Sequence, residues 1–316
     1  MAVGIAYSRS QTCSIKMVVL KSYKIADHHF SVEMPDKSTL WSAMEESYGP
    51  FELFEQDGEG CFALVVVDKI TCPEDRELLF TNEDSVQAGF VAISHFRLSD
   101  GGLYFELRHP NSVETNGCLH IEKKLSTAYL KLCGNSQEQW YVFNSAVQLC
   151  FMLSTIKHKT LLMHSSAVIY RGKAYLFLGK SGTGKSTHSA MWLKALEGVT
   201  LMNDDHPIVR VLDDGRAVAY GSPWSGKTRC YKNLKAPLGG VIRIVRAPYN
   251  RAVKLSTIHS YASLMTSCSG IVWDREFADY RDSALQAIVA HTPCWTMEAL
   301  ADEDAAIVCS TAVAGE

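Results

Sequence analysis

The chain has 316 residues and a formal net charge of −3 at pH 7. Its 47% hydrophobic and 21% charged residues are ordinary for globular proteins, which excludes disorder, collagen-like repeats and coiled coil as the dominant state. The small net charge provides no whole-chain attraction to nucleic acid or to an acidic membrane surface, so neither is an expected partner. At roughly 150 residues per domain, the length predicts two domains.

The amino-terminal segment and the cysteines bear on the compartment. Residues 1–16 lack a basic start and an apolar run of about seven residues, so we expect a disordered lead rather than a secretory signal. No apolar run approaches about 18 residues, so no transmembrane helix is expected. The ten cysteines include no C-x-x-C pair and are expected as small buried residues in a reducing compartment. The predicted location is therefore the cytoplasm.

The first half of the chain, residues 17–135, has the pattern of short strands separated by turns. The strand-like runs are 61–70, 88–98 and 102–110. Asp-Gly dipeptides, which favour hairpin turns, lie between such runs at Asp57-Gly58 and Asp100-Gly101. We expect a β-rich domain that acts either as an accessory domain or as a surface for recognising a substrate or partner.

The period of the pattern changes after this region. Over 136–159 the apolar residues recur at helical spacing, and no Pro or Gly interrupts them. We expect a connecting helix here. From 160 to 316 the pattern alternates strand, loop and helix, which indicates an α/β domain. The predicted fold class is therefore α+β or α/β, with the β-rich domain first.

The second half carries one motif that satisfies the full pattern G-x-x-x-x-G-K-[ST]. An apolar run at 174–178 precedes it, and a helix-like segment at 187–198 follows it. A glycine loop between a strand and a helix turns its backbone N–H groups inward and binds polyphosphate at the helix N-terminus. We expect ATP to bind at Gly179, Lys180, Ser181, Gly182, Thr183, Gly184, Lys185, Ser186 and Thr187.

Two side chains of this motif have expected roles of their own. Lys185 is expected to reach the β- and γ-phosphates as a point charge and so to act in catalysis. The hydroxyl of Ser186 is expected to bind Mg²⁺. The alternative interpretation is a glycine turn that binds no nucleotide.

A pair of carboxylates follows the expected helix. The strand-like run 200–203 ends in Asp204 and Asp205, the position of a metal-binding carboxylate near such a loop. We expect one carboxylate to face Mg²⁺ and the other to accept the proton of a substrate hydroxyl. Adjacent side chains of a regular strand point to opposite faces, so both can serve one site only if the chain bends there. A solvated turn is the alternative.

Two further candidates are a histidine and a loop. His164 lies in the apolar run before 174–178, where either a core residue or a site residue would fit. The segment 221–229 follows a probable hairpin and contains glycines, hydroxyls and the cations Lys227 and Arg229. Such a loop could clamp phosphate or close over a substrate, and it could equally be a plain surface loop.

Taken together, His164, the glycine motif and the pair Asp204-Asp205 resemble the catalytic domain of HPr kinase/phosphorylase, a P-loop group related to ATP-dependent phosphoenolpyruvate carboxykinase. The resemblance is specific over about residues 160–210. The stretches LFLGKSGTGKSTHSAMW, MNDDHP, GSPWSGKT and PLGGVI are similar to an uncharacterised phosphoenolpyruvate-carboxykinase-like branch of this family. Its relatives include kinases that phosphorylate a serine-type hydroxyl in peptide-modification clusters.

The resemblance implies a role for each matching residue. It implies that Asp205 is the general base, Asp204 a metal-side carboxylate and His164 an active-site histidine, although the residues alone leave open which aspartate does which. Lys185 and Ser186 match the phosphate and Mg²⁺ contacts. A homo-oligomer is also implied. The glutamate segment and the basic HPr-docking motif of HPr kinases have no counterpart here, so HPr itself is not implied as the substrate.

The leading hypothesis is an enzyme: an ATP- and Mg²⁺-dependent kinase that phosphorylates a hydroxyl of a small molecule, peptide or protein. Lys227 and Arg229 are candidates to stabilise charge on the transferred phosphoryl group. A phosphoenolpyruvate-carboxykinase-like enzyme is one alternative, but it needs a second, transition-metal site that the spacing of the residues does not assemble. A nucleotide-gated binding protein without catalysis is the other.

Overall fold

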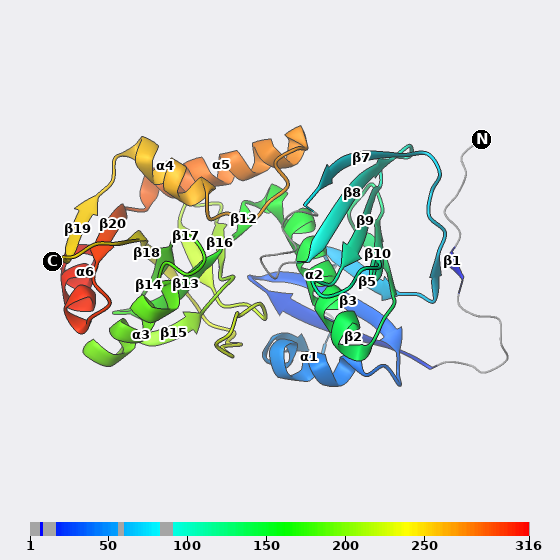
Figure 1. The fold of residues 1–316 in the computed structure, drawn as a ribbon, viewed down its shortest axis with the longest axis horizontal. Helices are drawn as coiled ribbons and strands as arrows, with labels where there is room; N and C mark the ends of the chain where they lie inside the picture. Colours follow the sequence, from blue (N-terminus) through cyan, green and yellow to red (C-terminus); the bar gives the residue numbers. More distant parts are fainter. Residues whose placement is uncertain (1–6, 9–16, 56–59, 83–90, 316) are drawn as a thin grey trace. The chain divides into compact units, whose positions relative to one another are not determined.

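The computed structural model describes residues 7–8, 17–55, 60–82 and 91–315. The chain divides into two compact units, Met1–Ser154 and Thr155–Glu316, each described by itself below (Figure 1). Most of the expected disordered lead and the Asp57-Gly58 turn lie outside the described residues.

The first unit is built mainly of strands. Its elements are β1 (Tyr7–Ser8), β2 (Val18–Ile25), β3 (His28–Pro35), α1 (Leu40–Tyr48), the 3-10 turn η1 (Gly49–Phe51), β4 (Glu52–Leu53), β5 (Phe62–Val66), β6 (Lys69–Ile70), β7 (Arg76–Thr81), β8 (Ala92–Leu98), β9 (Leu103–Arg108), β10 (Gly117–Ile121), β11 (Thr127–Leu132) and α2 (Ser136–Thr155). Nine strands form one sheet in the order β4-β2-β3-β5-β11-β10-β9-β8-β7, and β1 pairs with β6.

A row of aromatic rings lies in register across this sheet and packs against α2. Tyr23, Phe30 and Phe62 are cross-strand neighbours on β2, β3 and β5. The ring of Phe151 on α2 meets Phe30 edge-on at 6.3 Å, and the Tyr48 hydroxyl donates to Asn144 Oδ1 at 2.8 Å. The helix that the sequence placed over 136–159 therefore packs on the sheet of the first unit.

The Asp100-Gly101 dipeptide lies in the turn between β8 and β9, which pair antiparallel. Gly101 has φ of 86°, a left-handed backbone that glycine adopts without steric cost. The predicted hairpin at this point is confirmed.

The second unit mixes strands and helices. Its elements are the 3-10 turn η3 (Ile156–His158), β12 (Thr160–Leu162), β13 (Ser165–Tyr170), β14 (Lys173–Leu178), α3 (Lys185–Ala195), β15 (Thr200–Asn203), β16 (Ile208–Val211), β17 (Ala217–Tyr220), β18 (Lys235–Arg246), β19 (Arg251–Lys254), α4 (Thr257–Met265), α5 (Arg275–His291), β20 (Cys294–Ala299) and α6 (Glu303–Ala314). The mixed α/β class that the sequence predicts is confirmed.

The sheet of the second unit has a parallel centre. Its strands follow the order β12-β16-β17-β18-β14-β13-β15, and β20 pairs with both β18 and β19. β18 runs parallel to β14 on one side and to β20 on the other. The carboxyl ends of β14, β18 and β20 therefore meet at one edge of the sheet, and the glycine loop leaves from that edge.

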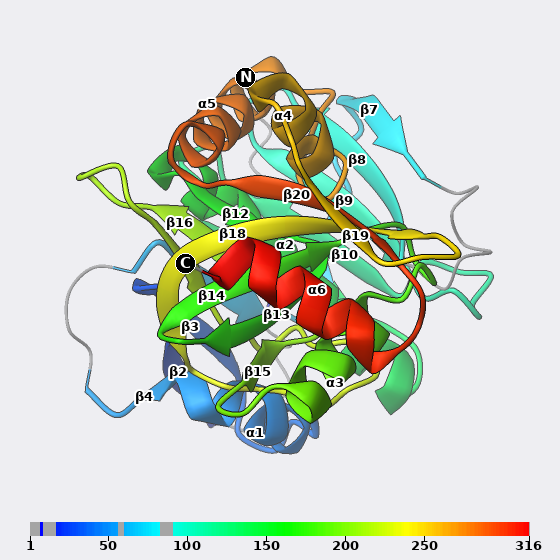
Figure 2. The same cartoon turned by 90° about the vertical axis from the view of Figure 1, so that its left-hand side faces the viewer.

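Helices α3 and α6 cover one face of this centre, and Figure 2 shows α6 in front of the sheet. Alternate residues of β14 point to this face, among them Tyr175 and Phe177, while Leu176 points to the other. Trp192 of α3 is fully buried, and its ring lies 5.3 Å from that of Phe177. At the C-terminal end of the unit β20 is followed by α6, and the side chain of Asp302 caps α6 by accepting from the Ala305 N–H.

The nine cysteines in the described part of the chain form no disulfide, and Cys150, Cys230, Cys294 and Cys309 are buried. Among the described residues, no helix combines the length and the apolar character needed to cross a bilayer.

The buried tryptophan of α3 supports a stability prediction. Trp192→Ala is expected to lower the free energy of unfolding by about 3–5 kcal/mol, because it removes a large ring from a closely packed core. Urea unfolding followed by circular dichroism measures the change. The control is Leu193→Ala, whose side chain is largely exposed on the same helix. Equal effects of the two substitutions would contradict this packing.

Candidate functional site

The glycine motif forms a loop between β14 and α3. Gly179 has φ of 156°, and a Cβ there would lie 2.8 Å from Thr183 Oγ1, so the position requires glycine. Gly182 and Gly184 have φ of 76° and 112°, and a Cβ at either would meet nothing within 4 Å. The loop thus leads into the N-terminus of α3 through left-handed backbone, with open space in front of it, as an anion nest requires.

The loop side chains fall into two groups. Lys180, Ser181, Ser186 and Thr187 are exposed, whereas Lys185 is buried. The exposed Ser186 hydroxyl is therefore accessible to a ligand. The Lys185 ammonium is directed inward, since its Nζ donates to the Gly179 carbonyl at 3.1 Å.

Lys185 also contacts a histidine from another part of the chain. Its Nζ lies 3.0 Å from His164 Nε2. Burial lowers the pKa of the Lys185 amine, and the charges of Asp205 and Asp204 oppose that change. The contact joins the glycine loop to the histidine and the aspartate pair.

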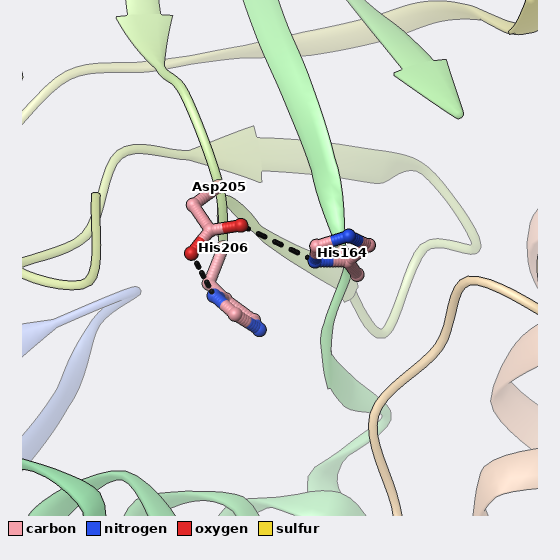
Figure 3. Close-up of side chains that lie close together, drawn as sticks. All are labelled: His164, Asp205 and His206. Atoms are coloured by element: carbon pink, nitrogen blue, oxygen red, sulfur yellow. Dashed lines mark ion pairs between the residues drawn. The ribbon is translucent and has the colours of Figure 1, made fainter. Parts of the chain in front are cut away.

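Asp205 lies between two histidines (Figure 3). His164 Nδ1 is 3.2 Å from Asp205 Oδ1, and His206 Nδ1 is 3.1 Å from Asp205 Oδ2. His164 sits at a bend between β12 and β13, not on a strand as expected, and its N–H donates to the Ser267 carbonyl. Because His164 lies in this bend, its side chain is not bound by the alternation of side chains along a β-strand.

The polarity of this cluster follows from its donors. An ammonium can only donate, so with Lys185 charged His164 Nε2 accepts, and the His164 proton sits on Nδ1, where it donates to Asp205. Burial by itself would raise the pKa of the Asp205 carboxyl. Hydrogen bonds from His164 and His206 outweigh burial and hold that pKa well below its usual range. Asp205 is therefore ionised at neutral pH.

The chain bends at Asp204 and Asp205, as the sequence requires if both carboxylates are to serve one site. The fully buried side chain of Asn203 holds this bend. Its Oδ1 accepts from the backbone N–H groups of Asp205 and His206, each at 2.9 Å. Its Nδ2 donates to the carbonyl and hydroxyl oxygens of Ser222 at 3.2 and 3.1 Å.

Asp204 faces a different direction from Asp205. It is only 9% exposed, and its Oδ2 accepts from the Thr228 hydroxyl at 2.6 Å. Its other oxygen, Oδ1, is buried and has no hydrogen-bond partner among the described residues. A buried carboxylate oxygen without a partner is costly, so this atom is suited to binding a cation.

The loop at 225–229 packs directly on the aspartate pair. A Cβ at Gly226 would lie 3.2 Å from the Asp205 Cβ, so the loop backbone approaches closely there. Lys227 and Arg229 are exposed on the same loop. The loop is joined to the bend through the Thr228 hydroxyl, which donates to Asp204.

Three residues of this site were not among those the sequence singled out: Asn203, His206 and Thr228. The signal for His206 was its position directly after the aspartate pair. Thr228 carried no pattern of its own, because its partner Asp204 is 24 residues away in the chain. Asn203 bonds locally to the N–H groups two and three residues on, but its partner Ser222 is 19 residues away.

The same cluster could hold a metal ion. One ligand atom each from His164, Asp205 and His206 lies within 4.8 Å of the other two. Imidazole nitrogen with carboxylate oxygen is a donor set for a transition metal. A metal would displace ring protons that now bind Asp205, and the Lys185 ammonium beside His164 would repel it.

No protein-family model and no curated protein matches the sequence. Among solved structures, the Hpr(Ser) kinase/phosphatase from Coxiella burnetii matches with 11% identity and a TM-score of 0.29, over 48% of this chain and 93% of that one. A superposition this loose carries no argument about function.

The bend held by Asn203 leads to a prediction. Asn203→Ala is expected to lower the free energy of unfolding by about 2–4 kcal/mol, because it removes the hydrogen bonds that the buried amide makes to the backbone of the bend and to Ser222. Chemical denaturation measures the loss. The control is Asn233→Ala, whose side chain is exposed. A loss no larger than in the control would show that the amide does not hold the bend.

Proposed function

We propose that the chain is an ATP- and Mg²⁺-dependent kinase that transfers a phosphoryl group to a hydroxyl of a small molecule, peptide or protein. The observation that carries the proposal is the contact from Lys185 of the glycine loop through His164 to Asp205. This contact joins a polyphosphate-binding loop to an ionised carboxylate that can accept a proton. Phosphoryl transfer to a hydroxyl requires both groups at one place.

The residues present fit the two ligands. For ATP, the open space in front of Gly182 and Gly184 fits phosphate oxygens on the loop amides. For Mg²⁺, the buried Asp204 Oδ1 and the exposed Ser186 hydroxyl are the matching oxygens. When bound, Mg²⁺ would neutralise charge on the phosphates.

The reaction assigns a task to each remaining group. The hydroxyl oxygen of the acceptor attacks the γ-phosphorus, the bond from that phosphorus to the β,γ-bridging oxygen breaks, and ADP leaves. Asp205 accepts the hydroxyl proton. The ring N–H groups of His164 and His206 already donate to Asp205, so they orient the carboxylate, and the proton that it holds weakly passes to solvent.

The cations of the 225–229 loop complete the proposed site. Lys227 and Arg229 are exposed beside the aspartate pair and are the candidates to bind the phosphoryl oxygens when a substrate is present. The motif resemblance supports placing the chain with the HPr kinase/phosphorylase-like proteins. The resemblance supports a hydroxyl group as the phosphoryl acceptor, but it does not identify the molecule that carries this hydroxyl.

Two substitutions test the kinase. Lys185→Ala is expected to lower turnover by roughly 10²-fold or more, because it removes a pre-oriented cation worth about 3 kcal/mol at the transition state. Asp205→Asn is expected to abolish turnover and to leave ATP binding intact. Transfer from labelled ATP, screened against cell extract, provides the acceptor and the assay.

Exposed residues of the same types serve as controls: Lys194→Ala, on the last turn of α3, and Asp213→Asn, in the turn after β16, should both retain full turnover. Near-normal turnover in Lys185→Ala would overturn the proposal. ATP binding by the wild-type chain with no transfer to any hydroxyl would favour the nucleotide-gated binding protein instead.

A second candidate is a phosphoenolpyruvate-carboxykinase-like reaction, which needs a transition-metal site in addition to Mg²⁺. The observation in its favour is the grouping of His164, Asp205 and His206. The like charge of Lys185 beside that grouping weighs against it, and so we expect no Mn²⁺-dependent exchange of labelled carbon dioxide into oxaloacetate. Exchange that requires Mn²⁺ and is lost in His206→Gln would replace the kinase with this function.

A further inference from the structure

A hydroxyl group of the chain itself lies at the aspartate pair of the proposed site. Thr228 Oγ1 donates to Asp204 Oδ2 at 2.6 Å, and the next residue after Asp204 is the proposed base, Asp205. Thr228 is exposed, although its hydroxyl makes this contact. A kinase needs the acceptor hydroxyl beside a carboxylate that can take its proton. The chain therefore holds one of its own hydroxyl groups where an acceptor belongs.

The loop that carries this hydroxyl is anchored at both ends. Before it, the Trp224 carbonyl accepts from the His206 N–H at 3.1 Å. After it, the buried Cys230 has its Sγ 3.5 Å from the Met202 carbonyl. Residues 226–229, between these anchors, are exposed. The loop is thus fixed beside the aspartates, while its middle is open to a ligand.

Contacts within the loop turn the Thr228 side chain toward the aspartates. Ser225 Oγ donates to the Thr228 carbonyl at 2.7 Å, and the chain bends at this point. A Cβ on Gly226 would lie 3.2 Å from Asp205 Cβ, so the backbone of the loop runs directly over that aspartate. Thr228 is two residues further along the chain from this crossing.

The charge of the sequence around Thr228 favours the approach of a phosphate. Lys227 and Arg229 are its neighbours in the chain, and both are exposed. From Asp214 to Asp274 the sequence contains no other Asp or Glu. The segment that carries Thr228 therefore attracts an anionic ligand rather than repelling it.

The distance from the glycine loop to the aspartates is bridged by one ring. Lys185 Nζ lies 3.0 Å from His164 Nε2, and His164 Nδ1 lies 3.2 Å from Asp205 Oδ1. A single imidazole thus separates the cation proposed to hold the γ-phosphate from the proposed base. A γ-phosphate bound by Lys185 is therefore within reach of a small movement of the exposed loop.

We propose that the chain phosphorylates its own Thr228, within one molecule, and that Thr228 is therefore a modification site. The proposal rests on the kinase function proposed above. Thr228 Oγ1 attacks the γ-phosphorus, the bond from that phosphorus to the β,γ-bridging oxygen breaks, and ADP leaves. The hydroxyl proton goes to Asp205, because Mg²⁺ on Asp204 makes the Asp204 carboxylate the weaker base.

The product limits the reaction to one event per chain. A phosphothreonine carries about −1.5 to −2 charges at neutral pH, and carboxylates beside it repel it. Asp204 and Asp205 would therefore drive the phosphorylated loop away from the site. Lys227 and Arg229 are the cations on the same loop that can bind the new phosphate.

The experiment incubates the full chain with labelled ATP and Mg²⁺ and maps the label by mass spectrometry. The label is expected on Thr228, and incorporation is expected to stop at one phosphate per chain. The initial rate per chain is expected to stay constant on dilution, as transfer within one molecule requires. Lys185→Ala is expected to lose the label.

The deciding variant is Thr228→Ser, which keeps a hydroxyl at this position. The labelled amino acid in its acid hydrolysate is expected to change from phosphothreonine to phosphoserine. Thr311→Ser, at an exposed position on α6, is the matched control and should retain phosphothreonine at the wild-type rate. Thr228→Val removes the hydroxyl and should lose the label, and its thermal unfolding shows whether the fold is kept.

The outcomes separate this proposal from the kinase function. Transfer to an acceptor in cell extract with no label on Thr228 would overturn the self-phosphorylation and leave the kinase standing. Label on another residue of the chain, or phosphothreonine that persists in Thr228→Ser, would also overturn it. A rate per chain that rises with concentration would replace transfer within one molecule by transfer between copies. No transfer by the wild-type chain to itself or to the extract would overturn both proposals.

Discussion

The buried amide of Asn203 decides where the two aspartates point. A regular strand would send Asp204 and Asp205 to opposite faces of the sheet. Asn203 instead accepts two backbone N–H groups just beyond the end of β15 and donates to Ser222. The bend that results directs Asp205 to the histidines and Asp204 to Thr228.

The electrostatics of the cluster depend on that bend. Both His164 and His206 contact Asp205, and their hydrogen bonds outweigh the burial that would otherwise raise its pKa. Lys185 lies on the other side of His164 and is buried, so its charge is poorly solvated. A buried cation that contacts one histidine ring and one backbone carbonyl is well suited to an anionic ligand. Phosphate would provide the missing negative charge.

The parallel centre of the second sheet brings the remaining parts together. The glycine loop, Arg246 and the segment after β20 all follow strands whose carboxyl ends lie at one edge. Through Arg246 the middle strand also contacts the backbone of the glycine loop. The proposed phosphate site is therefore a product of this arrangement of strands.

Local patterns in the sequence were sufficient for the α/β class, for the glycine loop between an apolar strand and a helix, for the hairpin at Asp100-Gly101 and for the need of a bend after Asn203. Each depends on neighbouring residues: on periodicity, on glycine's access to left-handed backbone, or on the alternation of a strand. Only the tertiary structure decided that His206 shares Asp205 with His164, that Thr228 holds Asp204, and that Arg246 contacts the backbone of the glycine loop. Those contacts join strands, bends and loops through sheet pairing and packing, and no local rule of the chain specifies which distant segments will meet.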